Sequence, residues 1–223
     1  LLNGTRNNYH RPSTAVHELG HTIGFAHSSV GEFNSLNSTA GTGRFGSPSD
    51  ALMPVAINNV PTMHPFGIDG AARATIEDDD RAAISRRYPN AAFPTTLGTI
   101  TGNVRRCSND MPVAGVNVRA INTSTGAQIS RYTAFDSNTT GRFEISVPPG
   151  SYNVVVEEMG HNGFTAGRMA INTATDQGFP FEFYGPTAES ELACSEDETE
   201  APLAVAVSAG NTSDIQIRLN DGV

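Results

Sequence analysis

Residues 17–27 have the sequence His17-Glu18-Leu19-Gly20-His21-Thr22-Ile23-Gly24-Phe25-Ala26-His27, and they hold three of the six histidines in this 223-residue chain. On a helix, His17 and His21 project from one face about one turn apart. Gly24 lets the chain leave that helix sharply, because glycine adopts left-handed conformations at little cost. The turn would then bring His27 back toward the first two imidazoles. This spacing predicts that three histidines bind one zinc ion and leave a fourth position for water.

Glu18 directly follows His17 and can reach a water molecule beside the metal. A carboxylate in this position is the general base of metal-assisted hydrolysis. The alternative is that core or surface histidines meet these spacings by chance. A purely structural zinc site needs no general base, so Glu18 favours hydrolysis.

Composition bounds the class of protein. The formal net charge is -9, and residues 96–223 hold 15 acids against 7 arginines. An acidic chain of this kind is not expected to bind nucleic acid, which selects a basic face. No apolar run approaches the ~18 residues of a membrane span. Cys107 and Cys194 predict a disulfide in a secreted protein, with two buried free thiols as the alternative.

Two helices are expected in the first part of the chain. Ser13 is expected to cap a helix over 14–24, with Val16, Leu19, Ile23 and Phe25 packing around the ligand face. A second helix is expected within 76–89, with acids at its start and arginines at its end. Its acid cluster could instead bind Ca²⁺, although carboxylates at a helix start are expected without an ion.

The hydrophobic period changes to two after residues 90–96, which are expected to be a linker. Six strands separated by turn residues are expected, and such an arrangement is typical of an antiparallel β-sandwich. They are expected at Gly98–Arg106, Val113–Asn122, Ala127–Phe135, Gly141–Val147, Ser151–Glu158 and Thr212–Leu219. The less regular residues 160–202 include an acidic stretch that is expected to be a solvated loop.

Three further features accompany residues 17–27: Ser28 after the third histidine, the segment Ala51-Leu52-Met53-Pro54, and a helix ending at Tyr88-Pro89. With them, residues 13–89 resemble the metzincin zinc metallopeptidases, and within that group the matrixin-like enzymes. The resemblance implies a Met-turn at Met53 that packs beneath the zinc. About 25 residues separate His27 from Met53, more than the matrixin pattern usually allows, so Met63 is the alternative.

The matrixin-like resemblance also implies a pocket for the substrate residue that follows the cut. Its expected wall consists of Val55, Ile57, Val60 and Phe66. His64 is expected to be a partly exposed loop histidine, with a place in the cleft or at a second metal as the alternative. Metzincins place a substrate-aligning sheet before the zinc helix, and only twelve residues precede it here. The chain is therefore expected to be N-terminally truncated.

Several turn and strand segments of the second half carry another resemblance. They are Ile100-Thr101-Gly102-Asn103-Val104, Pro112-Val113-Ala114-Gly115-Val116-Asn117-Val118, Gly141-Arg142-Phe143 and Val147-Pro148-Pro149-Gly150-Ser151-Tyr152-Asn153-Val154. In this order they resemble carboxypeptidase-regulatory-like (transthyretin-like) domains. Such signatures imply a fold more strongly than a function.

We therefore expect an α+β chain in three parts. Residues 1–89 would form the C-terminal part of a metzincin catalytic domain, 90–96 a linker, and 97–223 an all-β antiparallel sandwich. The expected function is that of a secreted zinc endopeptidase acting on a protein or peptide substrate. The alternative is an inactive metzincin remnant that binds a surface, a glycan or a partner protein through the β-sandwich.

Overall fold

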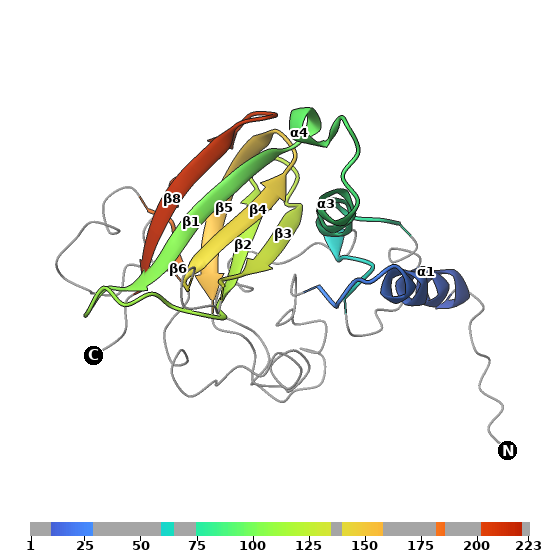
Figure 1. The fold of residues 1–223 in the computed structure, drawn as a ribbon, viewed down its shortest axis with the longest axis horizontal. Coiled ribbons are helices and arrows are strands. Elements are labelled where there is room, and N and C mark those ends of the chain that lie inside the picture. Colours follow the sequence, from blue (N-terminus) through green and yellow to red (C-terminus); the bar gives the residue numbers. More distant parts are fainter. Residues whose placement is uncertain are drawn as a thin grey trace, which may run out of the picture.

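A computed structural model, which describes residues 10–28, 59–64, 75–134, 140–157, 182–185 and 202–219, contains two facing β-sheets (Figure 1). One sheet has the strand order β4-β1-β8, and the other has the order β3-β2-β5-β6 with β7 also paired to β5. The strands are β1 (Gly98–Arg106), β2 (Asn117–Asn122), β3 (Gln128–Tyr132), β4 (Arg142–Val147), β5 (Gly150–Glu157), β6 (Glu182–Phe183), β7 (Val205–Val207) and β8 (Thr212–Leu219). The expected all-β sandwich is confirmed.

The pairing of β1 with β8 is parallel, with Thr99 opposite Thr212 and Arg106 opposite Leu219. The expectation of a wholly antiparallel sandwich is therefore wrong for this pair. The reason lies in the connection, because β7 belongs to the opposite sheet, where it runs antiparallel to β5. The chain crosses between the sheets after β7 and enters beside β1 in the same direction. Periodicity within a strand carries no information about that crossing.

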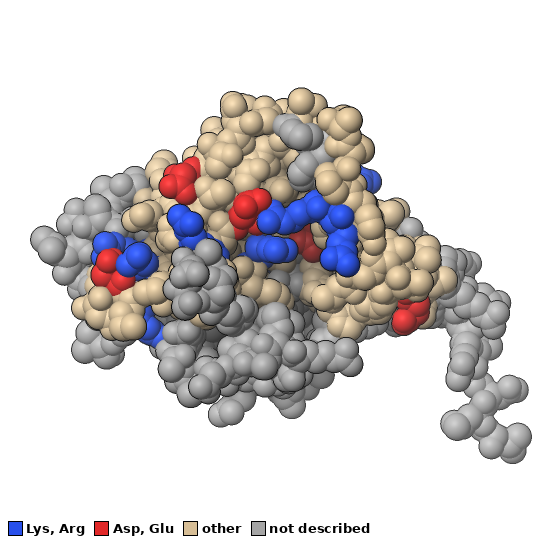
Figure 2. All heavy atoms as spheres, in the orientation of Figure 1, with Lys and Arg blue, Asp and Glu red and all other residues tan. Residues whose placement is uncertain are grey.

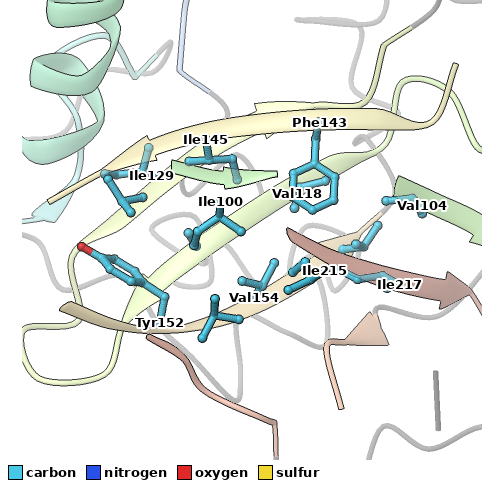
Figure 3. Close-up of a cluster of buried hydrophobic side chains, with 14 of the residues drawn as sticks. Ile100, Val104, Val118, Ile129, Phe143, Ile145, Tyr152, Val154, Ile215 and Ile217 are labelled. Atoms are coloured by element: carbon cyan, nitrogen blue, oxygen red, sulfur yellow. The ribbon is translucent and has the colours of Figure 1, made fainter. Parts of the chain in front are cut away.

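Alternating side chains from both sheets fill the space between them (Figure 3). On β1, buried and partly exposed positions alternate, and Ile100 and Val104 point inward with no exposed surface. Phe143 and Ile145 come from β4, and Val118 and Val154 come from the opposite sheet. This period of two is what the sequence predicts for strands with one buried face.

Three helices are described, and they differ from the expected bounds. The first helix, α1 (His10–Thr22), begins three residues before Ser13, which is buried inside it. Ser13 is therefore not the N-cap. The expected linker holds a short helix, α4 (Phe93–Thr96), and α3 (Asp78–Arg87) lies within the expected second helix. None of the described helices is long and apolar enough to cross a membrane.

Helix α3 connects the histidine segment to the sandwich, as Figure 1 shows. Its Ala82 side chain belongs to the hydrophobic core of the sandwich. Asp79 Oδ1 accepts the backbone N–H of Ser130 on β3 at 2.9 Å, and Arg86 forms an ion pair with Glu144 on β4. At the end of α3, the Tyr88 hydroxyl donates to the carbonyl of Ile23 at 2.8 Å. Helix α3 thus packs the first part of the chain onto the sandwich, and Asn59 adds a hydrogen bond to the carbonyl of Thr125 at 3.2 Å.

Candidate metal centre

Helix α1 and the turn that follows it bring three imidazoles together. The Nε2 atoms of His17 and His21 are 3.2 Å apart, those of His21 and His27 are 3.1 Å apart, and those of His27 and His17 are 3.3 Å apart. Gly24 has φ of 90°, the left-handed conformation expected where the chain leaves the helix. Nitrogen ligands at 2.0–2.1 Å around a tetrahedral zinc ion lie about 3.3 Å from one another. The three Nε2 atoms have the separations of one face of that tetrahedron.

Backbone carbonyls hold two of these rings in orientation. The Nδ1 atom of His17 lies 2.7 Å from the carbonyl oxygen of Thr62, and that of His21 lies 2.9 Å from the carbonyl oxygen of Phe25. A carbonyl can only accept, so Nδ1 carries the proton in each ring and Nε2 presents its lone pair. Metal-binding histidines commonly have this arrangement of an outer hydrogen bond and an inner ligand atom.

Glu18 lies on α1 next to His17 and is exposed. The neighbouring side chains of Leu19 and Ile23 are also exposed, at 59% and 38% of their full surface. Their expected role in packing around the ligand face is therefore wrong for these two residues. The helix turns its ligand face toward the 61–64 turn, which leaves Leu19 and Ile23 on the opposite side.

Met63 lies directly beneath the helix that carries the histidines. An ideal Cβ atom built on Gly20 would come within 2.2 Å of the Met63 sulfur, so only glycine allows this approach. The Met63 side chain is buried, and its carbonyl accepts the N–H of Ser28, one residue after the third histidine. Met53, the expected Met-turn residue, lies outside the described residues. Met63, the alternative, is buried against Gly20 of α1.

Asp80 of α3 fixes the turn that contains Met63. Its carboxylate accepts the backbone N–H groups of Thr62 at 2.8 Å, Met63 at 3.1 Å and Glu77 at 3.1 Å. The Glu77 bond is half of a capping box at the start of α3. Burial raises the pKa of Asp80, and the three N–H donors oppose that rise. Glu77 and Asp80 thus serve the start of the helix, which is the role expected for this acid cluster, and Asp80 also fixes the turn.

We predict that Gly20→Ala changes its effect with the residue at position 63. In the wild-type background, overpacking against Met63 should cost about 1–3 kcal/mol. Alanine should also gain about 1 kcal/mol of helix propensity over glycine. The net expectation is a loss of roughly 1 kcal/mol in the free energy of unfolding.

In a Met63→Ala background the sulfur is gone, so Gly20→Ala should instead stabilise the chain by roughly 1 kcal/mol. Urea denaturation of the four chains measures this coupling. An equal effect of Gly20→Ala in both backgrounds would contradict the contact between residues 20 and 63.

Asp79 lies at the other side of α3, between the histidine segment and the sandwich. Burial raises its pKa from 3.8 to about 6, while hydrogen bonds from the Ser28 side chain and the Ser130 backbone oppose the rise. Because the folded-state pKa is raised, the contribution of Asp79 to stability is fully present below the unfolded pKa. It is lost as the pH rises through about 6.

We therefore predict that Asp79→Asn, which keeps an oxygen acceptor for Ser130, removes this loss. Relative to wild type, its free energy of unfolding should rise by about 2 kcal/mol between pH 4 and pH 7. Urea denaturation at the two pH values measures the difference. The matched change Asp214→Asn on the exposed face of β8 should leave that difference near zero, and an equal response of both variants would contradict the prediction.

The other predicted site residues have different outcomes. Val60 is completely buried, so it cannot form the open wall of a substrate pocket. The other expected wall residues Val55, Ile57 and Phe66 lie outside the described residues. His64 lies in a turn, as expected, but it is only 3% exposed, contrary to the expected partial exposure, because this turn is enclosed by α1 and α3. Cys107 is disulfide-bonded, and Cys194 is the only other cysteine in the chain.

Comparison with known proteins concerns the sandwich. The family model of the carboxypeptidase regulatory-like domain matches residues 99–220, more than half of the 223 residues. The chain belongs to the carboxypeptidase regulatory-like domain family. The family match begins at β1 and does not extend to the histidine segment. The expected resemblance of the second half is confirmed. A search of curated proteins found no significant match.

Three solved structures similar to this family member share 11–16% sequence identity with it. BcpA, the major pilin subunit of Bacillus cereus, has a TM-score of 0.33 at 16% identity, covering 57% of this chain and 31% of the pilin. A "putative adhesin" from Bacteroides ovatus ATCC 8483 has a TM-score of 0.28 at 16% identity, covering 61% and 46%. The dioxygenase domain of a carbohydrate-binding fusion from Streptomyces sp. SirexAA-E has a TM-score of 0.26 at 11% identity, covering 58% and 84%. The chain spans less than half the length of the first two.

Proposed function

We propose that this chain is a zinc-dependent endopeptidase of the metzincin type, with His17, His21 and His27 as the zinc ligands. The observation that carries the proposal is the convergence of their three Nε2 atoms at separations of 3.1–3.3 Å. No other group of three or more histidine, cysteine or carboxylate side chains within the described ranges lies at metal-binding distances. The donor set fits zinc, which favours imidazole nitrogen and tetrahedral geometry.

Each residue of the segment has a distinct role in this proposal. Zinc bound here would supply Lewis-acid chemistry, acidifying a water molecule and polarising the carbonyl of a peptide bond. Glu18 accepts the proton of the attacking water and donates it to the departing amine. Thr62 and Phe25 orient the two ligand rings through their carbonyls. Met63 supports α1 by packing against Gly20 and does not bind the metal.

The disulfide at Cys107 supports a secreted, extracellular location for the enzyme, because disulfides persist in oxidising compartments. The substrate in this proposal is a protein or peptide. Three histidines without a fourth ligand among the described residues, beside an exposed glutamate, suit hydrolysis better than a closed structural zinc site.

A second candidate function is binding without catalysis. The family match covers the sandwich and not the histidine segment, which favours a module that binds a surface, a glycan or a partner protein. On this alternative the three histidines hold zinc in an inactive remnant.

We predict that Glu18→Gln retains zinc but cleaves a broad peptide library at least 100-fold more slowly than wild type, because general-base catalysis contributes about 10²–10⁴. Zinc content is measured by mass spectrometry on the same preparations, and cleavage is repeated with a chelator. A chelator should abolish wild-type cleavage.

The two candidate functions give different results. Equal cleavage by wild type and Glu18→Gln would remove the catalytic assignment. Stoichiometric zinc with no cleavage by either chain would favour the binding module. Absence of zinc from both chains would remove the metal site itself.

A further inference from the structure

A groove of about 1200 Å³ runs from the histidine segment along the sandwich. One wall is formed by residues 24–28 and α3, and the other by β3 and the polar face of β1 and β4. His27 and Met63 line its inner end. Figure 2 shows arginine side chains gathered in this region, beside a few acidic ones, over α3 and the adjoining strands. The volume exceeds the roughly 300–1,000 Å³ typical of a small-molecule pocket.

Four arginines from three elements line this groove, in a chain whose net charge is -9. Arg86 and Arg87 come from α3, Arg131 from β3 and Arg142 from β4. The Arg87 guanidinium lies over the turn that leads to His27, because a Cβ atom on Gly24 would be 3.3 Å from its Nη2 atom. The arginines therefore follow the groove from the histidines onto the sandwich.

Three of these cations form no ion pair with the acids of the groove. Glu144 is paired with Arg86, Asp79 accepts the backbone N–H of Ser130 at 2.9 Å, Asp80 accepts three backbone N–H groups, and Asp214 accepts the Thr101 hydroxyl at 2.8 Å. The other three arginines of the groove form no ion pair within the described part of the chain. They are Arg87, Arg131 and Arg142.

Arg131 lies beside charges of both signs. Partial burial lowers its pKa and repulsion from Arg86 lowers it further, while attraction to Glu144 and Asp79 opposes that shift. A cation held in this way is stabilised by any anion that enters the groove. The fork of a guanidinium group matches a carboxylate with two parallel hydrogen bonds.

We infer that this groove binds an acidic segment of a polypeptide, with glutamate or aspartate side chains paired to Arg87, Arg131 and Arg142. Asn103 also lines the groove and offers an amide group to a peptide backbone, and the Thr101 hydroxyl, which donates to Asp214, can still accept a hydrogen bond. The nearby carboxylates of Glu144 and Asp214, and the negative net charge, repel a densely charged polymer such as a sulfated glycan more strongly than a peptide with a few spaced carboxylates.

This site goes beyond the proposed peptidase function and does not require it. Because the groove begins at His27, an acidic stretch of a protein substrate would be held beside the zinc ligands. Binding itself depends on the arginines and can be measured on a chain that cannot cleave. A failure of catalysis therefore leaves the inference testable.

The test is fluorescence anisotropy of labelled ten-residue peptides with the Glu18→Gln chain. One peptide alternates glutamate with glycine, and the matched peptide alternates glutamine with glycine. We expect the glutamate peptide to bind at least about tenfold more tightly, and to weaken with added salt. Arg87→Gln with Arg131→Gln should remove most of this preference. Arg81→Gln, on the outer side of α3 and 67% exposed, should change the affinity less than about twofold.

The charge-reversed pair Arg87→Glu with Arg131→Glu guards against simple unfolding. A folded variant should lose the glutamate peptide and bind a lysine–glycine peptide instead, whereas an unfolded chain would bind neither, and circular dichroism identifies that case. Equal binding of the glutamate and glutamine peptides would overturn the inference. So would an Arg81→Gln loss as large as that of the groove variants, or tighter binding of a heparin fragment that displaces the glutamate peptide.

Discussion

The His21→Ala chain should unfold at the same temperature with and without zinc, whereas the wild-type chain should become more stable when zinc is added. A ligand that binds only the folded state at 1,000 times its dissociation constant stabilises that state by about 4 kcal/mol. For a chain of this size, that is a rise of roughly 10 °C in the unfolding temperature. His21 is the most informative ligand to remove, because its Nε2 atom lies 3.2 Å and 3.1 Å from those of His17 and His27.

The control is His161→Ala, since His161 has no neighbouring histidine at ligand spacing in the sequence. This variant should keep the full response to zinc, measured by differential scanning calorimetry over a series of zinc concentrations. A zinc response of His21→Ala equal to that of wild type would place the metal elsewhere in the chain. This experiment reports binding alone, so it remains informative even if no substrate is cleaved.

The candidate site could be predicted from sequence where the determinants are local. His17 and His21 need only a helix, and Gly24 needs only a left-handed residue, so spacing along eleven residues was sufficient. The same holds for β1 and β8, whose bounds match the alternation of apolar and polar residues. The alternation of apolar and polar residues predicts these strands correctly because each strand presents one face to the core.

The packing of Met63 beneath α1 could not be predicted from sequence, because it depends on contacts distant in the sequence. Gly20 lies 43 positions before it, and Asp80 holds its backbone from 17 positions after it. Neither partner is visible from the turn itself, whereas Ala51-Leu52-Met53-Pro54 matches a short motif.

The predictions of the N-cap of α1 and of the direction of β8 were wrong for related reasons. Ser13 is a common capping residue, but the helix starts earlier and encloses it. The direction of β8 follows from the crossing after β7, a strand of three residues that the sequence pattern did not separate from its surroundings. The start of α1 and the direction of β8 both depend on the path of the preceding chain and not on the residues of the helix or strand itself.

Arg119 is the strongest case of a residue that the sequence pattern misplaces. On β2 it alternates with Val118 and Ala120, which face the core, so alternation predicts a solvated side chain. It is instead completely buried on the other face of the sheet. Its Nη2 atom lies 3.0 Å from Glu157 on β5, and its Nη1 atom donates to Gln128 on β3 at 3.1 Å. The Arg119 side chain on β2 thus joins β5 through an ion pair and β3 through a hydrogen bond.

Arg119→Met should therefore destabilise the chain by about 3–5 kcal/mol, because it leaves the buried carboxylate of Glu157 without its cation. Asn117 would still donate to Glu157 at 2.8 Å, and one neutral hydrogen bond cannot compensate a buried charge. The measurement is the free energy of unfolding in urea. Arg105→Met is the matched control on β1, since Arg105 is paired with Asp110 at the surface and should cost about 0–1 kcal/mol.

The double change Arg119→Met with Glu157→Leu separates lost charge pairing from lost packing. Replacing a buried ion pair by apolar side chains of similar volume is often neutral or stabilising, so most of the loss should be recovered. If the double variant is as unstable as Arg119→Met alone, the contribution of Arg119 is its packing across β3, β2 and β5. If the single change costs no more than Arg105→Met, Glu157 is not held as a buried anion. The coupling between the two positions, expected to exceed about 2 kcal/mol, is the quantity that decides between these accounts.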